Sequence, residues 1–198
     1  MNTGKMKKTG ILSGSFNPPH IGHLAIANYM LEYEGLDELW FIVSPHNPLK
    51  DAGSLVPEDQ RLEMVQIAIR DEPRFHASDI EFTLPRPSYT INTLDTLSQR
   101  YPDREFYLIM GSDNLLLLDR WKEHERLVST YKILVYPRPG YPTGDISNPN
   151  IRIVEAPLLD ISSTVIRESF RQGRKLRYWL PDGLFDHIVA KNIYSRTE

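Results

Sequence analysis

The 198-residue chain contains no cysteine, no long hydrophobic run and no excess of basic residues. The lack of cysteine excludes disulfides, thiolate metal ligands and cysteine nucleophiles, and it fits a reducing compartment. No segment reaches the roughly 20 apolar residues of a membrane helix, and no apolar stretch follows the basic residues of Met1–Lys8 as it would in a signal peptide. The net charge of −3 provides no basic field for nucleic acid or an anionic membrane. We therefore expect a cytoplasmic protein without nucleic-acid or membrane partners.

Strands and helices are predicted to alternate along the chain. Short apolar runs such as Leu39–Val43 (LWFIV) and Glu105–Met110 (EFYLIM) indicate buried strands, whereas Ile21–Tyr33 repeats apolar residues at helical spacing. Such alternation is typical of a Rossmann-like α/β fold, a doubly wound parallel sheet with helices on both faces. The length suits a single domain over residues 1–198, with a helical subregion at 160–198. The pattern predicts strands at 10–12, 39–43, 74–77, 105–110, 131–136 and 151–155, and helices at 21–33, 57–70, 88–100, 115–128 (in one or two pieces), 163–172 and 181–192.

The segment Ser13–Leu24 (SGSFNPPHIGHL) lies between the first predicted strand and the first predicted helix. In a doubly wound sheet this corner binds phosphate, because small residues let backbone N–H groups approach an anion and the helix N-terminus favours negative charge. Gly14 and Ser15 are the small residues here. His20 and His23 stand three positions apart at the start of the helix, so both imidazoles lie on one face. The segment therefore predicts a corner in which two imidazoles donate hydrogen bonds to phosphate.

The two histidines also have other interpretations. A single histidine is most often structural, and a His-x-x-His pair on a helix can supply two ligands of a zinc site. In a chain without cysteine the remaining ligands would come from His46, His76 or a carboxylate. The glycine, serine and proline residues around the pair favour phosphate over zinc, and we expect no metal ion held by protein ligands alone.

The segment Ile161–Phe170 (ISSTVIRESF) predicts a second anion site. Ser162 or Ser163 is a good N-cap for the helix that follows, and Arg167 falls in its early turns, where a guanidinium can bind two phosphate oxygens. Taken alone, the segment is typical of an ordinary capped helix with an exposed arginine. Together with the predicted phosphate corner, it favours phosphate binding by hydroxyls, by N–H groups at the helix start and by the arginine.

His20-Ile21-Gly22-His23 resembles the HIGH signature that class I aminoacyl-tRNA synthetases share with nucleotidylyltransferases, and the short chain favours the second group. The whole opening segment and four later ones resemble, in order, motifs of bacterial nicotinate mononucleotide adenylyltransferases. The later segments are Ser44–Lys50 (SPHNPLK), Arg86–Leu97 (RPSYTINTLDTL), Met110–Trp121 (MGSDNLLLLDRW) and Ile161–Phe170. Two stretches depart from the family pattern. Gly-Ser-Phe-Asn stands where the family often has Gly-Thr-Phe-Asp, and Asn-Pro-Leu-Lys stands where it often has Pro-Pro-His-Lys.

The resemblance implies a nucleotidyltransferase of NAD biosynthesis, which transfers the adenylyl group of ATP to nicotinate mononucleotide and releases pyrophosphate. The attacking phosphate is already ionised at neutral pH, since its second pKa is about 6, so the reaction needs phosphate donors rather than a general base. Mg²⁺ would arrive with the triphosphate and keep several waters. We expect the catalytic residues to be His20, His23, Lys50 and Arg167. The expected ATP contacts are Gly14, Ser15, Phe16, His20, His23, Gly111, Asp113, Ile161, Ser162, Ser163, Thr164 and Arg167.

The mononucleotide contacts are less sharply defined. Thr90 stands near a predicted helix start, whose donors suit a nicotinate carboxylate. Trp121 could stack on the pyridine ring or belong to the core, Asp113 could accept from a ribose or cap a helix, and Arg138 could be a lid residue or a loop cation. The expected mononucleotide contacts are Ser15, Phe16, Asn47, Lys50, Tyr89, Thr90, Trp121 and Arg138.

Two other functions stay open at this point. Another adenylyltransferase would act on nicotinamide mononucleotide or pantetheine phosphate, although Arg86–Thr90 and Trp121 speak against pantetheine phosphate. A non-catalytic nucleotide sensor is the third interpretation, and such proteins generally carry an added DNA-binding or kinase module for which we find no spare segment. A homo-oligomer is compatible with the sequence, which does not determine the assembly.

Overall fold

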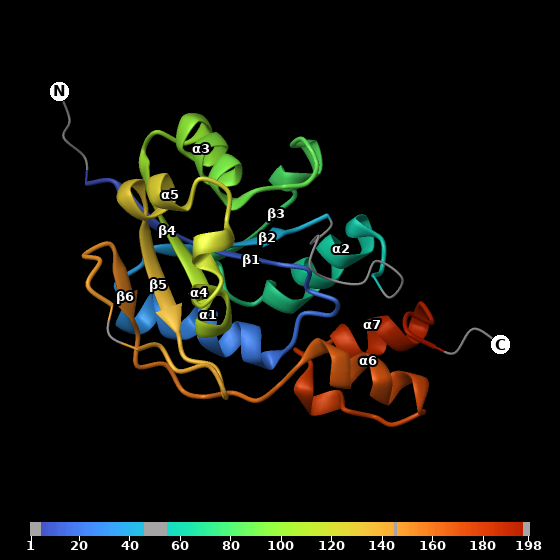
Figure 1. The fold of residues 1–198 in the computed structure, drawn as a ribbon. Coiled ribbons are helices and arrows are strands. Elements are labelled where there is room, and N and C mark those ends of the chain that lie inside the picture. Colours follow the sequence, from blue (N-terminus) through green and yellow to red (C-terminus); the bar gives the residue numbers. More distant parts are fainter. Residues whose placement is uncertain (1–4, 46–54, 145, 196–198) are drawn as a thin grey trace.

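The computed structural model describes residues 5–45, 55–144 and 146–195. Six parallel strands form one sheet in the order β3-β2-β1-β4-β5-β6 (Figure 1). This is the strand order of a Rossmann-like sheet, so the predicted fold class is confirmed. The strands are β1 (Lys7–Gly14), β2 (Glu38–Val43), β3 (Phe75–Ser78), β4 (Arg104–Gly111), β5 (Lys132–Tyr136) and β6 (Ile151–Ile153).

Helices cover both faces of the sheet (Figure 1). They are α1 (Ile21–Tyr33), α2 (Glu58–Ile69), α3 (Thr90–Arg100), α4 (Ser112–Leu115), α5 (His124–Thr130), α6 (Ser163–Arg171) and α7 (Leu184–Ala190). α1, α2, α6 and α7 contribute to the hydrophobic cluster on one face, and α3 and α5 to the cluster on the other. Because side chains alternate along a strand, β1 sends Leu12 to the first cluster and Ile11 to the second. Within the described residues, no helix is both long and apolar enough to cross a membrane.

Most predicted elements are present, with ends that lie within three residues of the expected ones. The stretch 115–128 is mostly helical, as predicted, and it is broken into short pieces. The structure divides it among α4, the 3₁₀ helix η3 (Leu118–Arg120) and α5. Trp121 is extended, and Glu123 has a positive φ of 52° directly before α5, so a continuous helix cannot pass through these residues.

The C-terminal helices pack on the same face of the sheet as α1 and α2. Ile166 of α6 and Leu184 and Ile188 of α7 are fully buried in the cluster that α1 and α2 also form. The ring of Phe170 stacks on that of Phe185 with centroids 5.5 Å apart. These contacts place the start of α6, which carries the ISST sequence, beside the carboxyl ends of the central strands.

Candidate active site at the ends of strands β1 and β4

The carboxyl ends of β1 and β4 form the centre of the candidate site. The strands are neighbours, with Leu12 paired to Ile109, yet the helices that follow them pack on opposite faces of the sheet. Open α/β sheets bind ligands in the crevice at such a point. A Cβ atom on Gly111 would lie 2.4 Å from Asp113 Oδ1 and 2.6 Å from Arg138 Cδ. The missing side chain at Gly111 therefore lets Asp113 and Arg138 meet at the edge of this crevice.

His20 and His23 lie at the N-terminus of α1. His20 is the N-cap and His23 the third helical residue, and their rings stack with centroids 3.7 Å apart. The two imidazoles thus lie together, as the spacing predicted. The backbone N–H of His20 donates to Nδ1 of His23 at 3.2 Å. Because Nδ1 can accept only without a proton, this bond places the ring proton of His23 on Nε2 and makes that nitrogen a donor.

Burial keeps His20 uncharged at neutral pH. Its side chain is 6 % exposed. Desolvation by burial and, after it, the positive charge of Arg138 lower the pKa of His20 to about 4. His20 can therefore donate one hydrogen bond to a phosphate oxygen but contributes no positive charge of its own.

Phe16 supports the histidine pair from inside the protein. Its φ is 46°, its ring is buried, and it packs edge-on against His23 at 5.1 Å and against Phe41 at 5.6 Å. A Cβ atom on Gly14 would lie 3.2 Å from this ring, so the glycine allows the ring to fold back beneath the loop. Any contact of Phe16 with a substrate would consequently involve its backbone.

Four buried polar atoms around the corner have no hydrogen-bond partner in the part of the chain that the structure describes. They are Ser15 Oγ, His20 Nδ1, Asp113 Oδ1 and Arg167 Nε. Leaving such an atom unpaired costs about 1–3 kcal/mol, which is why most buried polar atoms in proteins are paired. The other carboxylate oxygen of Asp113 lies 3.1 Å from Arg138. This set of atoms suits the oxygens of phosphate and ribose groups and marks the corner as the candidate site.

The start of α6 is hydrogen-bonded to the phosphate corner. Ser163 Oγ donates to the carbonyl oxygen of Pro18 at 2.8 Å, and Arg167 Nη1 donates to that of Asn17 at 2.9 Å. Ser162 is the N-cap, and its hydroxyl accepts from the N–H of Val165. The expected free hydroxyl of Ser163 is not present in this conformation, because the bond to Pro18 uses its only proton. The backbone N–H groups at the start of α6 keep the predicted capacity for phosphate.

Arg61 is a central residue of the site region that the sequence analysis missed. It is fully buried in α2, and its guanidinium donates to four backbone carbonyls, those of Ser15, Ser44, Pro45 and Val56, at 2.7–3.0 Å. It thereby joins the phosphate corner to the residues that follow β2 and precede α2. The available signal was an arginine at helical spacing with the apolar residues of α2, where an amphipathic helix would place a hydrophobic side chain.

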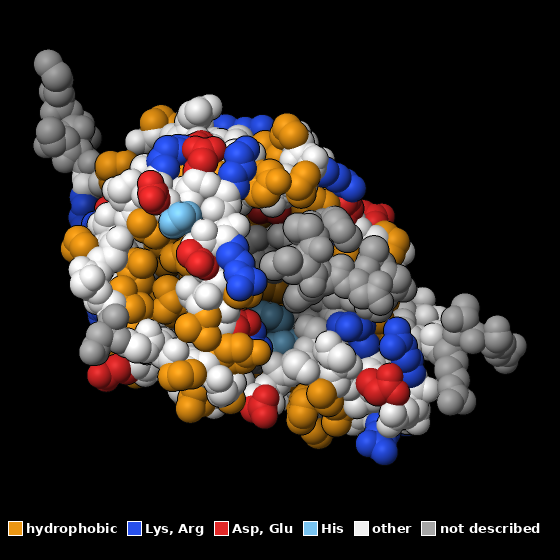
Figure 2. All heavy atoms as spheres, viewed as in Figure 1, with side chains coloured by type: hydrophobic (Ala, Val, Ile, Leu, Met, Phe, Trp, Pro, Cys, Tyr) orange, Lys and Arg blue, Asp and Glu red, His pale blue; other side chains and the backbone are white. Residues whose placement is uncertain are grey.

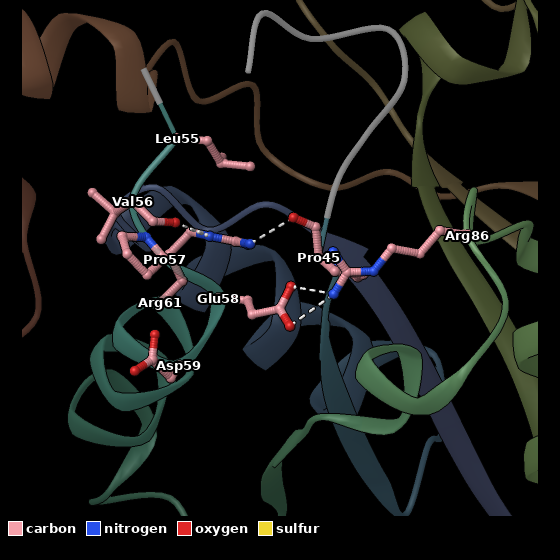
Figure 3. Close-up of a pocket in the computed structure, with 8 residues that line it drawn as sticks. All are labelled: Pro45, Leu55, Val56, Pro57, Glu58, Asp59, Arg61 and Arg86. Atoms are coloured by element: carbon pink, nitrogen blue, oxygen red, sulfur yellow. Dashed lines mark hydrogen bonds and ion pairs between the residues drawn. The ribbon is translucent and has the colours of Figure 1, made fainter. Parts of the chain in front are cut away.

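A pocket of about 350 Å³ opens beside this arginine (Figure 3). Its wall includes Arg86 and Glu58, which form a double ion pair at 2.9 Å, and Arg61 with its carbonyl partners. Figure 3 shows the guanidinium groups turned toward these partners. Because Arg86 is paired with Glu58 and the guanidinium of Arg61 is occupied by backbone carbonyls, the pocket is a weaker candidate for phosphate than the adjoining corner.

Three of the residues expected at the mononucleotide, Tyr89, Thr90 and Trp121, lie outside the phosphate corner, whereas Ser15 and Phe16 belong to it. Tyr89 is the N-cap of α3 and Thr90 its first residue, two positions later than the predicted helix start. The Nζ atom of Lys122 lies 4.8 Å above the ring of Tyr89. Trp121 is partly buried against the cluster beneath α3. Asp113 is not an N-cap, because Gly111 occupies that position of α4 and Asp113 lies in the first turn.

Asn47 and Lys50 lie outside the described residues, as does His46. His76, another ligand considered for zinc, contacts Glu38 at 3.3 Å at the start of β2. In residues 5–45, 55–144 and 146–195, no group of three or more His, Asp or Glu side chains could hold a metal ion. Figure 2 shows histidine side chains at the bottom of a hollow near the middle of the surface, with Lys and Arg side chains at its border.

Comparison with known proteins assigns the chain to a family. The cytidylyltransferase-like family matches residues 11–169. A protein of Bacteroides fragilis, named a probable nicotinate-nucleotide adenylyltransferase, is 57% identical and aligns over 93% of this chain and 92% of its own length. A Flavobacterium johnsoniae protein of the same name is 43% identical over 96% of this chain and 100% of its own. The chain belongs to the nicotinate-nucleotide adenylyltransferases. The resemblance found in the sequence is thereby confirmed, as is the enzyme class, a nucleotidyltransferase.

A solved structure of this adenylyltransferase family shares the fold. The Plasmodium falciparum nicotinic acid mononucleotide adenylyltransferase complexed with NaAD superposes with a TM-score of 0.78 at 21% identity, covering 95% of this chain and 97% of its own. At this identity the likeness concerns the fold. It agrees with the six-stranded sheet of this chain.

Proposed function

We propose that this protein transfers the adenylyl group of ATP to nicotinate mononucleotide, producing nicotinate adenine dinucleotide and pyrophosphate. The observation that carries the proposal is the set of buried atoms on Ser15, His20, Asp113 and Arg167 at the strand switch point, which have no hydrogen-bond partner among the described residues. The names of the relatives support the choice of substrates.

In this reaction a phosphate oxygen of the mononucleotide attacks the α-phosphorus of ATP. A new bond forms between them, and the bond from the α-phosphorus to the bridging oxygen of pyrophosphate breaks. The phosphate is already ionised near neutral pH, since its second pKa is about 6, so no residue has to remove a proton. The protein has to hold two anions in line and to stabilise charge on the transferring and leaving oxygens.

The corner provides donors for this purpose. His20 is a neutral donor, and the bond from the His20 backbone directs the donor of His23 to Nε2. The helix start of α1 adds a favourable dipole for an anion. Arg167 lies at the junction of α6 and the corner, where a small rotation would exchange its bond to Asn17 for one to phosphate. Lys50, on the segment after β2, remains a predicted catalytic cation.

The corner also fits a divalent metal ion that arrives with ATP. Its groups are imidazole, hydroxyl and guanidinium donors, which bind phosphate oxygens rather than cations, and Asp113 is available to accept from metal-bound waters. Mg²⁺ binds phosphates in this way, using one or two carboxylates and several waters. When bound, the ion neutralises phosphate charge. We propose Mg²⁺ as that ion.

The pyridine specificity is proposed to depend on the start of α3. The first N–H groups of a helix have no acceptor within it, so those near Tyr89 and Thr90 can bind a group that only accepts. A nicotinate carboxylate is such a group, whereas an amide would present its NH₂ to one of the donors. One mismatch of this kind costs about 1–3 kcal/mol, and the amide also loses the attraction between the carboxylate charge and the helix dipole, so we expect at least a tenfold preference for the acid.

The proposal is tested by measuring pyrophosphate release from ATP and Mg²⁺ with nicotinate mononucleotide, nicotinamide mononucleotide and pantetheine phosphate in parallel. We expect the highest kcat/KM with nicotinate mononucleotide, loss of activity with EDTA and recovery with Mg²⁺. Equal efficiency with the nicotinamide compound would mean that the start of α3 does not discriminate. Nucleotide binding without release from any of the three would favour the sensor interpretation.

A further inference from the structure

Two glutamates are almost completely buried, one at the amino ends of the strands and one near their carboxyl ends. Glu38 is 2 % exposed at the start of β2, and Glu81 is 3 % exposed in the 3₁₀ helix η2 (Ile80–Thr83). Glu38 is neutralised by Lys7 at 2.6 Å and by Arg104 at 2.9 Å. Within the described residues, no Lys or Arg forms an ion pair with Glu81. The two carboxylates therefore have the same burial but opposite electrostatic environments.

Hydroxyl groups surround Glu81 instead of cations. Its Oε1 accepts from Thr93 Oγ1 at 2.9 Å and from Ser13 Oγ at 3.5 Å. Ser13 Oγ lies in turn 3.0 Å from Ser44 Oγ. Ser13 is the penultimate residue of β1, Ser44 follows β2, and Thr93 lies near the start of α3. One carboxylate thus joins three elements that border the candidate site.

A buried carboxylate without a cation is expensive for stability. Burial raises the pKa of Glu81, while the hydroxyls of Thr93, Ser44, Ser13 and Ser88 act in the opposite direction. Hydroxyl donors compensate the loss of water less well than a cation does. A core with stability as its only requirement would place an uncharged side chain here, so the position beside the site points to a role in function.

We infer that Glu81 is a positioning residue for the mononucleotide. Its hydrogen bonds to Thr93 and Ser13 hold the start of α3 at a fixed distance from the phosphate corner, and this aligns the pyridine end of the mononucleotide with its phosphate. The inference rests on the proposed function. It concerns the mononucleotide half of the site, because ATP is expected to bind between the corner and α6. Loss of the carboxylate should therefore raise the KM for nicotinate mononucleotide much more than the KM for ATP.

The test compares the KM values of both substrates in Glu81→Ala and Glu81→Gln. For Glu81→Ala we expect the KM for nicotinate mononucleotide to rise at least tenfold, while the KM for ATP changes less than threefold. Glu81→Gln keeps an oxygen that accepts from Thr93, so it should restore most of the affinity. If Glu81→Ala does not fold, Thr93→Val removes the same hydrogen bond without charge or volume change and should show the same selective rise.

The matched control is Glu38→Gln, which alters the other buried carboxylate. It should lower the melting temperature and leave the ratio of the two KM values unchanged. Equal increases in both KM values for Glu81→Ala, Glu81→Gln and Thr93→Val would overturn the inference and make Glu81 an ordinary core group. If the wild-type protein is inactive with nicotinate mononucleotide, the proposed function itself fails, and this outcome is distinct because it precedes any substitution.

Discussion

At the scale of single residues, burial decides what an imidazole can do. His20 and His23 stack on each other, but His20 is almost fully enclosed while His23 is held by a backbone N–H. Both imidazoles are thereby suited to donate hydrogen bonds to phosphate rather than to act as a general acid or base. This agrees with a reaction whose nucleophile is already ionised.

Replacing His23 by alanine should reduce kcat by about 10²–10³, the usual effect of removing one donor to a developing oxyanion. Pyrophosphate release under saturating substrates measures this effect. The melting temperature should change little, because His23 lies on the first turn of α1 at the surface of the corner. His124→Ala, on α5, is the matched control and should retain full activity. Near-wild-type activity in a folded His23→Ala protein would remove this histidine from the mechanism.

Arg138→Gln should raise the pKa of His20, because the charge of Arg138 is the second cause of its depression. Burial, the larger cause, remains, so the pKa should stay below 6.5. An NMR titration of the imidazole protons measures the change. Arg126→Gln removes an equivalent charge on α5 that is paired with Asp95 of α3 and is not among the causes of the His20 shift, so it should leave His20 unaffected. An unchanged His20 in Arg138→Gln would show that the two groups do not interact.

At the scale of elements, one helix residue organises the segments around the site. Arg61 projects from α2 and donates to four carbonyls that all precede this helix in the chain, so the conformation of the corner depends on a helix that supplies no predicted substrate contact. The α6 helix acts in a similar way through Ser163 and Arg167. The loops are thus held by side chains from elsewhere in the fold.

Arg61→Met should destabilise the protein by about 3–5 kcal/mol, because four buried carbonyls lose their donor. Urea unfolding measures the free energy. Arg70→Met, at the C-terminal end of the same helix, is the comparison. Arg70 is half exposed and pairs with Asp182 on the surface, so its loss should cost at most about 1 kcal/mol. Equal losses for the two variants would contradict the structural role given to Arg61.

At the scale of the whole molecule, the two ends of the strands differ: the amino ends carry groups that stabilise the fold, and the carboxyl ends carry the candidate site. The amino ends of the strands hold the ion-paired Glu38, and the carboxyl ends hold the hydroxyl-bound Glu81 and the phosphate corner. We propose that the chain folds as one domain, because α6 and α7 share a hydrophobic cluster with α1 and α2. The helical subregion at 160–198 would then not unfold separately.

The stability of the protein should fall in acid as Glu38 is protonated. Burial alone would raise the pKa of Glu38, but hydrogen bonds from Lys7, Arg104 and Thr9 outweigh it and lower the pKa to about 2, from 4.5. The unfolded chain therefore binds this proton first, so the contribution is complete above pH 4.5 and is lost as the pH falls toward 2. Glu38→Gln should lose on the order of 3 kcal/mol at neutral pH and show a flatter decline in acid than the wild type. Urea unfolding at a series of pH values decides this, with Glu125→Gln, at an exposed position of α5, as the control that should change stability little.

The sequence by itself determined the fold class and predicted where the candidate site lies. The alternation of apolar strands and amphipathic helices requires a sheet covered on both faces, and the segment Ser13–Leu24 follows the first strand of that sheet. These are local patterns, because hydrophobic periodicity and a helix start depend on neighbouring residues. The family resemblance was likewise readable from short motifs in order.

Only the tertiary structure decided which polar groups meet. Arg61 and Ser15 are far apart in the sequence, as are Ser163 and Pro18, and no local pattern reports a contact that depends on how helices pack on the sheet. The sequence pattern of residues 115–128 likewise did not locate the break between the helical pieces, where Glu123 takes a positive φ of 52° directly before α5. The dependence on packing also explains why the two buried glutamates look alike in the sequence: the difference between them lies in the partners that distant segments bring, cations for Glu38 and hydroxyls for Glu81.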